Sequence, residues 1–188
     1  MQIEPQAISD VLLITPRRFG DARGFVSETF RLSKLVEAGV RFSFVQDNHT
    51  FSAAAGTVRG LHAQMPPSAQ GKLVRVARGA IWDVAVDVRH GSSSFGRYVA
   101  AELSAENWRQ LWIPPGFLHG LCTLEDNTEI IYKMTSEYDP ETECGALWND
   151  PDLALPWPVS PERAILSEKD RVRSCLAECP AWFSYETA

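Results

Sequence analysis

The stretch Lys72–Val88, which reads KLVRVARGAIWDVAVDV, decides the fold class. It contains two short runs rich in valine, Lys72–Ala77 and Ile81–Val88, and valine is a residue that β-strands favour. The second run alternates, so its side chains point to two faces. One face carries Trp82, Val84, Val86 and Val88, and the other carries Ile81, Asp83, Ala85 and Asp87. Arg78–Gly79, between the two runs, is interpreted as a hairpin turn.

Strand patterns continue outward from this stretch. Val99–Leu103, Leu111–Ile113 and Thr128–Met134 are further short strands, separated by turn-rich segments such as His90–Gly96. Many short strands at this spacing favour an antiparallel sandwich or barrel, and a small barrel can hold one small ligand in its mouth.

Helical signals are few. In Arg31–Gly39, apolar residues recur at i, i+3 and i+4, and a glycine ends the segment. A second short helix is predicted to begin around Ser160–Glu162, where a proline occupies a first-turn position.

Polar side chains share strand faces with apolar ones. Tyr132 lies on the same face as Ile130 and Met134, and Asp83 and Asp87 lie with Ile81 and Ala85. Such a face lines either a pocket or the outside of a barrel, and the pattern alone favours neither.

Composition narrows the class of protein. The 188 residues are 45% hydrophobic and carry a net charge of −6, with no basic run. One globular domain spanning 1–188 is expected, with neither nucleic acid nor an anionic membrane as a partner. A small anionic ligand remains compatible with this charge. The N-terminus does not resemble a secretion signal, and the spacing of the four cysteines fits no disulfide framework or zinc ribbon, so a cytoplasmic location is expected.

Two of the histidines lie in segments that bear on a possible metal site. His119 ends a Pro-x-Gly-x-x-His turn of the kind in which double-stranded β-helix proteins, the cupins, place a metal ligand. These proteins add a His-x-His pair and a glutamate, whereas this chain offers a lone His62 with Gly60 two residues before it. Two histidines without the second histidine of the pair and the glutamate make a poor metal site, so no metal is expected.

Three side chains form a set for acid–base chemistry without a metal. His62 is a natural general base, the Lys72 ammonium can stabilise an oxyanion, and Tyr132 can donate a proton. Together they suffice for epimerisation through an enolate. Nucleophilic catalysis has weaker support, since no Ser or Cys lies in a G-x-S-x-G or comparable motif.

A series of ordered blocks covers nearly the whole chain. They are Gly20–Phe25, Phe44–His49, Val58–His62, Ala69–Arg75, Asp83–Asp87, Leu103–Asn107, Gln110–Pro114, Tyr132–Lys133, Trp148–Pro151 and Ser167–Asp170. In these blocks the sequence resembles the dTDP-4-dehydrorhamnose 3,5-epimerases.

The resemblance implies an all-β, cupin-type jelly roll with a few short peripheral helices. It also implies a homodimer that exchanges an N-terminal segment of about residues 1–30, and a helical or irregular C-terminal segment of about 160–188. The substrate is a dTDP-4-keto-6-deoxy sugar, epimerised at C3 and C5 without a cofactor.

The resemblance also assigns roles to residues. His62 is the base, oriented and made more basic by Asp170, with Asp83 as the alternative orienting residue. Lys72 holds the C4 oxygen, and Tyr132 is the proton donor on the other face. The residues that match substrate contacts are Phe19, Arg23, Glu28, Gln46, Asp47, Asn48, Arg59, His119, Tyr138, Glu143 and Lys169.

Some of these contacts have more specific expectations. Arg59 and the partner subunit's Arg23 are suited to the diphosphate, with Glu28 on the same arm. Tyr138 matches a residue that stacks on thymine, and Phe19 adds an aromatic surface from the partner chain. Arg23 and Glu28 could instead form an interface ion pair, and Glu143 is expected in a loop.

Two departures from the family pattern bear on specificity. Ala63 stands where a tyrosine is usual and Leu118 where an alanine is typical, each beside a histidine expected in the pocket. They leave open a monofunctional 3- or 5-epimerase of a secondary-metabolite pathway. A non-catalytic sugar-binding cupin is the alternative from another class.

Overall fold

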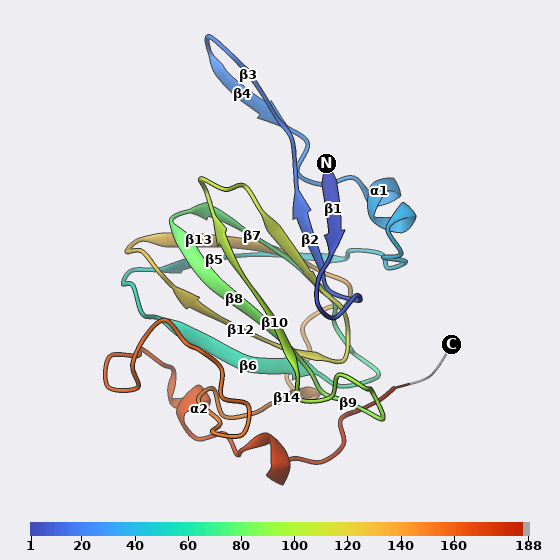
Figure 1. Cartoon of the computed structure of the whole chain (residues 1–188), viewed down its shortest axis with the longest axis vertical. Helices are drawn as coiled ribbons and strands as arrows, with labels where there is room; N and C mark the ends of the chain where they lie inside the picture. The colour runs from blue at the N-terminus through green and yellow to red at the C-terminus, as the bar shows by residue number, and fades with distance from the viewer. Residues whose placement is uncertain (186–188) are drawn as a thin grey trace.

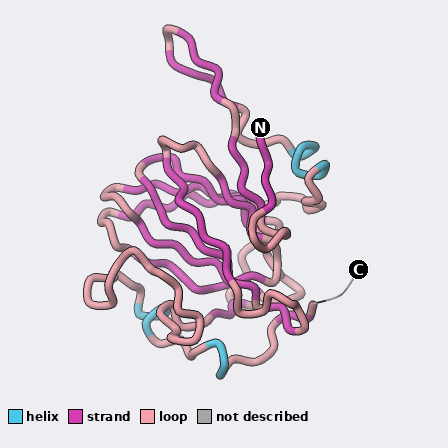
Figure 2. The backbone as a smooth tube through the Cα atoms, in the orientation of Figure 1, coloured by secondary structure: helices cyan, strands magenta, loops and turns pink. Residues whose placement is uncertain are grey.

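Two antiparallel β-sheets face each other in the computed structural model, which describes residues 1–185 (Figure 1; Figure 2). The six-stranded sheet has the order β1 (Gln2–Pro5), β2 (Leu12–Thr15), β11 (Gln110–Ile113), β7 (Lys72–Arg78), β13 (Thr128–Met134), β5 (Gln46–Ser52). The five-stranded sheet has the order β10 (Tyr98–Ser104), β8 (Ala80–Asp87), β12 (Phe117–Thr123), β6 (Val58–Gln64), β14 (Glu143–Gly145). This is the predicted all-β jelly roll.

The predicted hairpin at Arg78–Gly79 is wrong. β7 pairs with β11 and β13, whereas β8 pairs with β10 and β12, so the chain crosses from one sheet to the other at this point. Gly79 has a φ of +75°, and a Cβ there would collide with the Thr128 side chain. The crossing therefore requires glycine for both its backbone conformation and its close packing.

The space between the sheets holds the main core. Val74 and Val76 of β7 pack there against Ile81 and Ala85 of β8, and all four are at most 3% exposed. The alternation predicted for β8 is confirmed, because Val84 and Val86 belong to a second cluster on the other face of the sheet. The sheet is covered on that face by residues of the C-terminal third, including Leu153 and Phe183.

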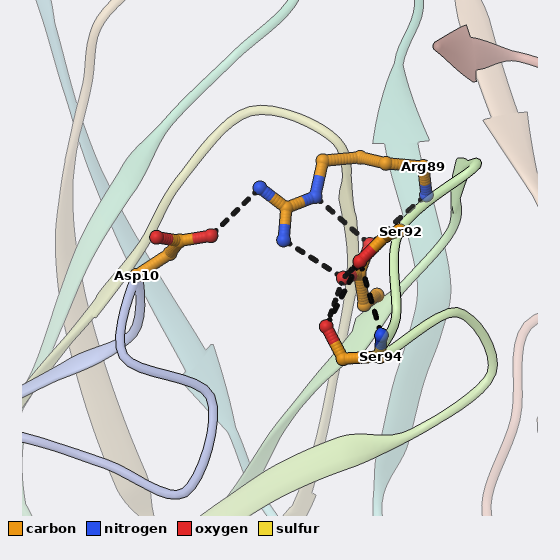
Figure 3. A network of polar contacts seen from close by, with 5 residues as sticks. Asp10, Arg89, Ser92 and Ser94 are labelled. Carbon is orange, nitrogen blue, oxygen red and sulfur yellow. Dashed lines mark hydrogen bonds and ion pairs between the residues drawn. The ribbon is translucent and has the colours of Figure 1, made fainter. Parts of the chain in front are cut away.

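Asp87, at the end of β8, is fully buried in a polar network. Arg89 binds its carboxylate through Nε at 2.9 Å and Nη2 at 2.7 Å, and the hydroxyls of Ser92 and Ser94 donate at 2.7 and 2.6 Å. Figure 3 shows these side chains converging, with Asp10 on the far side of the guanidinium. Burial alone would raise the pKa of the Asp87 carboxyl, but these hydrogen bonds lower it below its ordinary value. The Asp87 carboxylate therefore holds the turn that follows β8, because its partners Arg89, Ser92 and Ser94 all lie in the segment after that strand.

The N-terminal region carries a projecting hairpin. β3 (Arg18–Asp21) and β4 (Gly24–Ser27) extend away from the two sheets (Figure 1) and expose Phe19, Phe25 and Val26. The predicted helix within Arg31–Gly39 is confirmed as α1 (Leu32–Glu37).

The C-terminal region is mostly irregular. It contains α2 (Glu168–Arg171), the 3-10 helix η1 (Leu176–Glu178) and β15 (Phe183–Ser184), which pairs in parallel with β9 (Arg89–His90). The helix predicted around Ser160–Glu162 is wrong, because the chain makes only a hydrogen-bonded turn there. The predicted C-terminal segment ends in residues 186–188, outside the described part. In residues 1–185, no helix has the length and apolar character needed to cross a membrane.

Candidate active site

A cavity of about 580 Å³ lies between the two sheets and reaches the C-terminal segment. Most residues predicted for the site line it, and they come from both sheets, from α2 and from the segment between β13 and β14. They are Asn48, Arg59, His62, Lys72, His119, Tyr132, Tyr138, Glu143, Lys169 and Asp170. Of the polar side chains whose strand faces could line either a pocket or the outside of a barrel, Tyr132 lines the cavity. Asp83 and Asp87 point inward without lining it.

The two histidines are on the five-stranded sheet. His62 of β6 lies opposite His119 of β12 in the pairing, and their ring centroids are 6.1 Å apart. The strands approach closely at Gly60, which has a φ of +106° and where a Cβ would collide with the His119 carbonyl oxygen. Glycine at this position therefore allows the approach that brings the two rings together.

Lys72 and Tyr132 belong to the opposite sheet. Lys72 is the first residue of β7, and Tyr132 lies in β13 directly beside Asn48 of β5. The Asn48 amide nitrogen donates to the Tyr132 hydroxyl at 3.3 Å. The candidate base and the candidate proton donor thus come from opposing walls of one cavity.

Asp83 hydrogen-bonds His119 rather than His62. Its Oδ1 lies 2.7 Å from His119 Nε2, and both side chains are buried. The alternative role for Asp83, orienting His62, is therefore wrong. Its contact instead holds the second ring of the pair.

The pairing expected between His62 and Asp170 is not formed in the described chain. Asp170 lines the cavity, but its Oδ2 accepts from the Ser167 hydroxyl at 2.9 Å and its Oδ1 lies 3.9 Å from Arg173 Nε. The physical reason is local, since Ser167 caps α2 and both carboxylate oxygens face groups of their own segment.

The pKa of His62 is lowered well below its ordinary value, opposite to the expected increase in basicity. Burial of the ring is the largest cause, followed by electrostatic interactions with Lys72, His119, Arg173 and Lys169. The ring is therefore a neutral imidazole at neutral pH, which is the form that can accept a proton.

Lys72 is also perturbed. Lys72 is 5% exposed, and burial lowers the pKa of its ammonium to about 8. The charges of Asp83 and Glu143 act in the opposite direction and raise that pKa. A pKa of about 8 leaves most of the lysine protonated at pH 7. The cavity therefore keeps a buried cation facing a neutral imidazole.

Glu143 begins the edge strand β14 and does not lie in a loop as predicted, because its backbone pairs with Gln64 of β6. Lys169 and Arg173 each approach its Oε1 at 2.5 Å, and the Tyr138 hydroxyl donates to its Oε2 at 3.0 Å. Burial alone would raise the pKa of this carboxyl, but these partners lower it. Glu143 is thus an anion at the cavity wall.

A chain of hydrogen bonds links this wall to Tyr132. The Tyr138 backbone N–H donates to Gln46 Oε1 at 2.8 Å, and Gln46 Nε2 donates to Asn48 Oδ1 at 3.0 Å. Gln46 does not line the cavity itself, yet it orients Asn48, which contacts Tyr132.

The other predicted contacts lie away from the cavity. Asp47 points to the opposite face of β5 and pairs with Lys133 at 2.8 Å. A separate hollow of about 340 Å³ lies on that face, and both Asp47 and Glu28 line it. Phe19 and Arg23 are on the projecting hairpin, where Arg23 pairs with Asp21 at 2.7 Å. Within one chain, these four residues are not brought to the site.

Glu28 has a different ion-pair partner from the one considered above. It binds Arg31 at 2.6 Å, three residues along the chain, and the Arg23 side chain is 90% exposed. In the single chain, Arg23 and Glu28 therefore each have a local partner.

Ala63 lines the cavity beside His62, whereas Leu118 does not line it and packs behind the five-stranded sheet. Both belong to the cluster that contains Val84 and Val86, on the outer face of the five-stranded sheet. Leu118 is fully buried there, and Ala63 is 5% exposed and paired with Cys144. The departure at Leu118 therefore alters packing behind the sheet, whereas the departure at Ala63 falls at the cavity itself and stays a reason to expect an altered sugar site.

Sequence reasoning missed several groups at the site. Thr50, Gln64 and Gln70 line the cavity, and Arg173 contacts Glu143 behind it. Only Arg173 carried a usable signal, because it follows Asp170 at the i, i+3 spacing of a helical ion pair.

Arg59 lines the cavity, and its guanidinium is only partly paired within the protein. Its Nη2 donates to the Phe51 carbonyl and the Ser52 hydroxyl at 3.3 and 3.2 Å, while its buried Nε has no partner in the part of the chain that the structure describes. Across the same residues, no three His, Cys, Asp or Glu side chains are grouped closely enough to hold a metal ion.

The chain matches the family model described as dTDP-4-dehydrorhamnose 3,5-epimerase over residues 5–178. It is 49% identical over 185 residues to the dTDP-4-dehydrorhamnose 3,5-epimerase of Sinorhizobium fredii, covering 98% of this chain and 94% of that one. The dTDP-4-dehydrorhamnose 3-epimerase of Streptomyces niveus is 35% identical, covering 95% of this chain and 85% of that one.

A solved structure agrees over the whole length. The dTDP-6-deoxy-D-glucose-3,5-epimerase of Legionella pneumophila, in complex with dTDP-4-keto-L-rhamnose, is 40% identical. It superimposes with a TM-score of 0.93 and covers 99% of both chains. With its two-sheet cavity and these matches, the chain belongs to the dTDP-4-dehydrorhamnose 3,5-epimerase family.

Proposed function

We propose that this protein epimerises dTDP-4-keto-6-deoxyglucose at C3 and C5 to dTDP-4-keto-L-rhamnose, without a cofactor. One observation carries the proposal: a neutral imidazole and a tyrosine hydroxyl face one cavity from opposing sheets, with a buried ammonium in the same cavity. An inversion needs a base on one face of the sugar ring and an acid on the other. The two sheets supply that arrangement.

The mechanism follows from these groups. His62 removes a proton from the carbon beside the C4 ketone, and the electrons of the broken C–H bond move to the ketone oxygen as an enolate. Lys72 stabilises that developing negative charge. Such electrostatic stabilisation is strong in a buried site. Tyr132 then donates its proton to the opposite face of the same carbon, which inverts it, and solvent restores both protonation states.

The same ketone acidifies both neighbouring carbons. One base and one acid on opposing walls can therefore serve C3 and C5 in turn, provided that each carbon is presented to His62. The higher identity to a 3,5-epimerase than to a 3-epimerase, 49% against 35%, supports action at both carbons. A 3-epimerase is the second candidate, and deuterium at C3 alone would favour it.

Cationic groups at the cavity suit the nucleoside diphosphate. Arg59 has a buried Nε without a protein partner among the described residues, and Lys169 lies at the wall with its side chain 59% exposed. Tyr138 is 56% exposed, so its ring can stack on the thymine base. We assign the diphosphate to Arg59 and Lys169, and the thymine to Tyr138.

The proposal includes a homodimer in the cytoplasm. Phe19, Phe25 and Val26 are between 50% and 74% exposed on the projecting hairpin, which is apolar area that a partner subunit would cover. Arg23, on the same hairpin, would then reach the partner's cavity. Four free thiols among the described residues fit a reducing compartment.

Deuterium exchange tests the reaction. The purified protein is incubated with dTDP-4-keto-6-deoxyglucose in heavy water, and NMR locates the label in the sugar. We expect deuterium at C3 and C5 together with inverted configuration, and no enzymatic label with His62→Ala. A protein that binds the nucleotide sugar but adds no deuterium at either carbon would instead be a sugar-binding cupin.

Mixed dimers test the shared site. His62→Ala and Arg23→Ala chains are each expected to have little activity alone. If Arg23 acts in the partner's cavity, a mixed dimer contains one site with both native residues, so random mixing restores about a quarter of the native activity. No restoration by mixing would place Arg23 outside the partner's site.

A further inference from the structure

Arg173 lies two residues after α2 with its guanidinium enclosed by protein. The side chain is 13% exposed, and it packs over Gly145 of β14, where a Cβ would come within 2.7 Å of Arg173 Cζ. A glycine at 145 therefore leaves the room that the guanidinium occupies. Burying such a group is costly unless it is paired, so its partners indicate what it does.

The partners are two carboxylates of the cavity wall. Arg173 Nη2 donates to Glu143 Oε1 at 2.5 Å, and its Nε stands 3.9 Å from Asp170 Oδ1. Glu143 and Asp170 line the cavity, whereas Arg173 does not. The guanidinium thus joins the C-terminal segment to β14 from behind the wall.

The hydrogen-bond chain described above extends this contact to the candidate acid. Glu143 accepts from Tyr138, which is connected through Gln46 and Asn48 to the Tyr132 hydroxyl. Each link is between 2.8 and 3.3 Å. Displacement of Glu143 would therefore be transmitted to the group proposed to protonate the substrate.

We propose that Arg173 is a positioning residue that fixes Glu143 and Asp170 at the cavity wall and, through Glu143, aligns Tyr132. The inference rests on the proposed epimerisation. Misplacing a catalytic group by about 1 Å can cost on the order of a hundredfold in rate, so loss of this contact lowers kcat more than it raises KM.

The charge of Arg173 has a second effect, on His62. The titratable and charged groups that line the cavity with His62 are Arg59, Lys72, His119, Tyr132, Tyr138, Glu143, Lys169 and Asp170. Arg173 lies behind Glu143 and Asp170. The positive charge of Arg173 is one cause of the lowered His62 pKa. Its removal raises that pKa, and the acid limb of kcat/KM moves to higher pH.

Three variants test the proposal: Arg173→Met, Arg173→Lys, and Arg171→Met as a matched control. Arg171 is in α2 with its side chain 49% exposed, and its ion-pair contact with Glu168 is 3.9 Å long. We expect Arg173→Met to lower kcat about tenfold or more with a smaller change in KM. Arg173→Lys keeps the charge and recovers part of kcat, and Arg171→Met behaves as the native protein.

An NMR titration of the His62 ring in the ligand-free protein separates this inference from the proposed activity. Arg173→Met is expected to raise the His62 pKa, and Arg173→Lys to leave it near the native value, with or without turnover. Thermal unfolding identifies any variant that has lost its fold. Equal kcat in Arg173→Met and the native protein, or equal impairment of both Arg173 variants with an unchanged His62 titration, would overturn the proposal.

Discussion

Replacing Lys72 by methionine should make the protein more stable while abolishing its proposed activity. The Lys72 ammonium is buried, and its pKa falls from 10.5 to about 8 because burial disfavours the charged form. That difference corresponds to a destabilisation of about 3 kcal/mol at neutral pH, at about 1.36 kcal/mol per pH unit. Methionine has a similar length and no charge, so Lys72→Met should recover up to about this amount.

The gain should depend on pH in a defined direction. Below pH 8, Lys72 is protonated in both the folded and the unfolded chain, so the folded protein bears the full cost of the buried charge. Between pH 8 and 10.5 the unfolded chain binds more protons than the folded one, and native stability rises with pH. The advantage of Lys72→Met therefore shrinks over that interval.

Urea unfolding at pH 7 and at pH 9.5 measures both effects. Lys133→Met is the matched control, since Lys133 lies on the outer face of β13 and pairs with Asp47 at 2.8 Å. A surface ion pair contributes about 0–1 kcal/mol, so this variant should be neutral or slightly less stable. A Lys72→Met protein that is less stable than the native one at pH 7, or whose gain is the same at both pH values, would refute the reasoning.

Two further substitutions, each with a comparison variant elsewhere in the chain, test the packing around the cavity. Gly145→Ala would place a Cβ against the Leu61 carbonyl oxygen and should cost several kcal/mol in a urea unfolding experiment, whereas Gly20→Ala, with its nearest atom 3.6 Å away, should be nearly neutral. Thr50→Val should leave the free energy of unfolding unchanged or raise it by up to about 1 kcal/mol, because the buried Thr50 hydroxyl has no partner in residues 1–185. Thr128→Val removes a 2.8 Å hydrogen bond and should lower that free energy by about 1 kcal/mol; equal effects of the two threonine variants would contradict this reasoning.

The strands could be predicted from local pattern, but their pairing could not. Thr128–Met134 has the bounds that alternation gave it, and the two faces of Ile81–Val88 are as predicted. The crossing at Gly79 was missed because a short Arg-Gly link has the same composition whether the chain turns back within a sheet or passes to the other one. Long-range packing decides between these two paths.

The candidate site was predictable as a set of residues, but its internal contacts were not. His62, Lys72 and Tyr132 do meet at one cavity, yet they come from strands far apart in the sequence. The partner of Asp83 depends on which histidine its strand neighbours, and β8 pairs with β12, which carries His119. No local pattern contains that information. The lowered His62 pKa likewise reflects burial and the lysine and arginine charges that the fold gathers around the ring.

The most direct test of opposed proton transfer is the Tyr132→Phe protein in heavy water with dTDP-4-keto-6-deoxyglucose. His62 can still remove a proton and return a deuteron to the same face, whereas the opposite face has lost its donor. NMR of the recovered sugar should therefore show deuterium beside the ketone with the original configuration retained. Inverted product formed at the native rate would contradict the assignment of the acid to Tyr132 and of base and acid to opposing sheets.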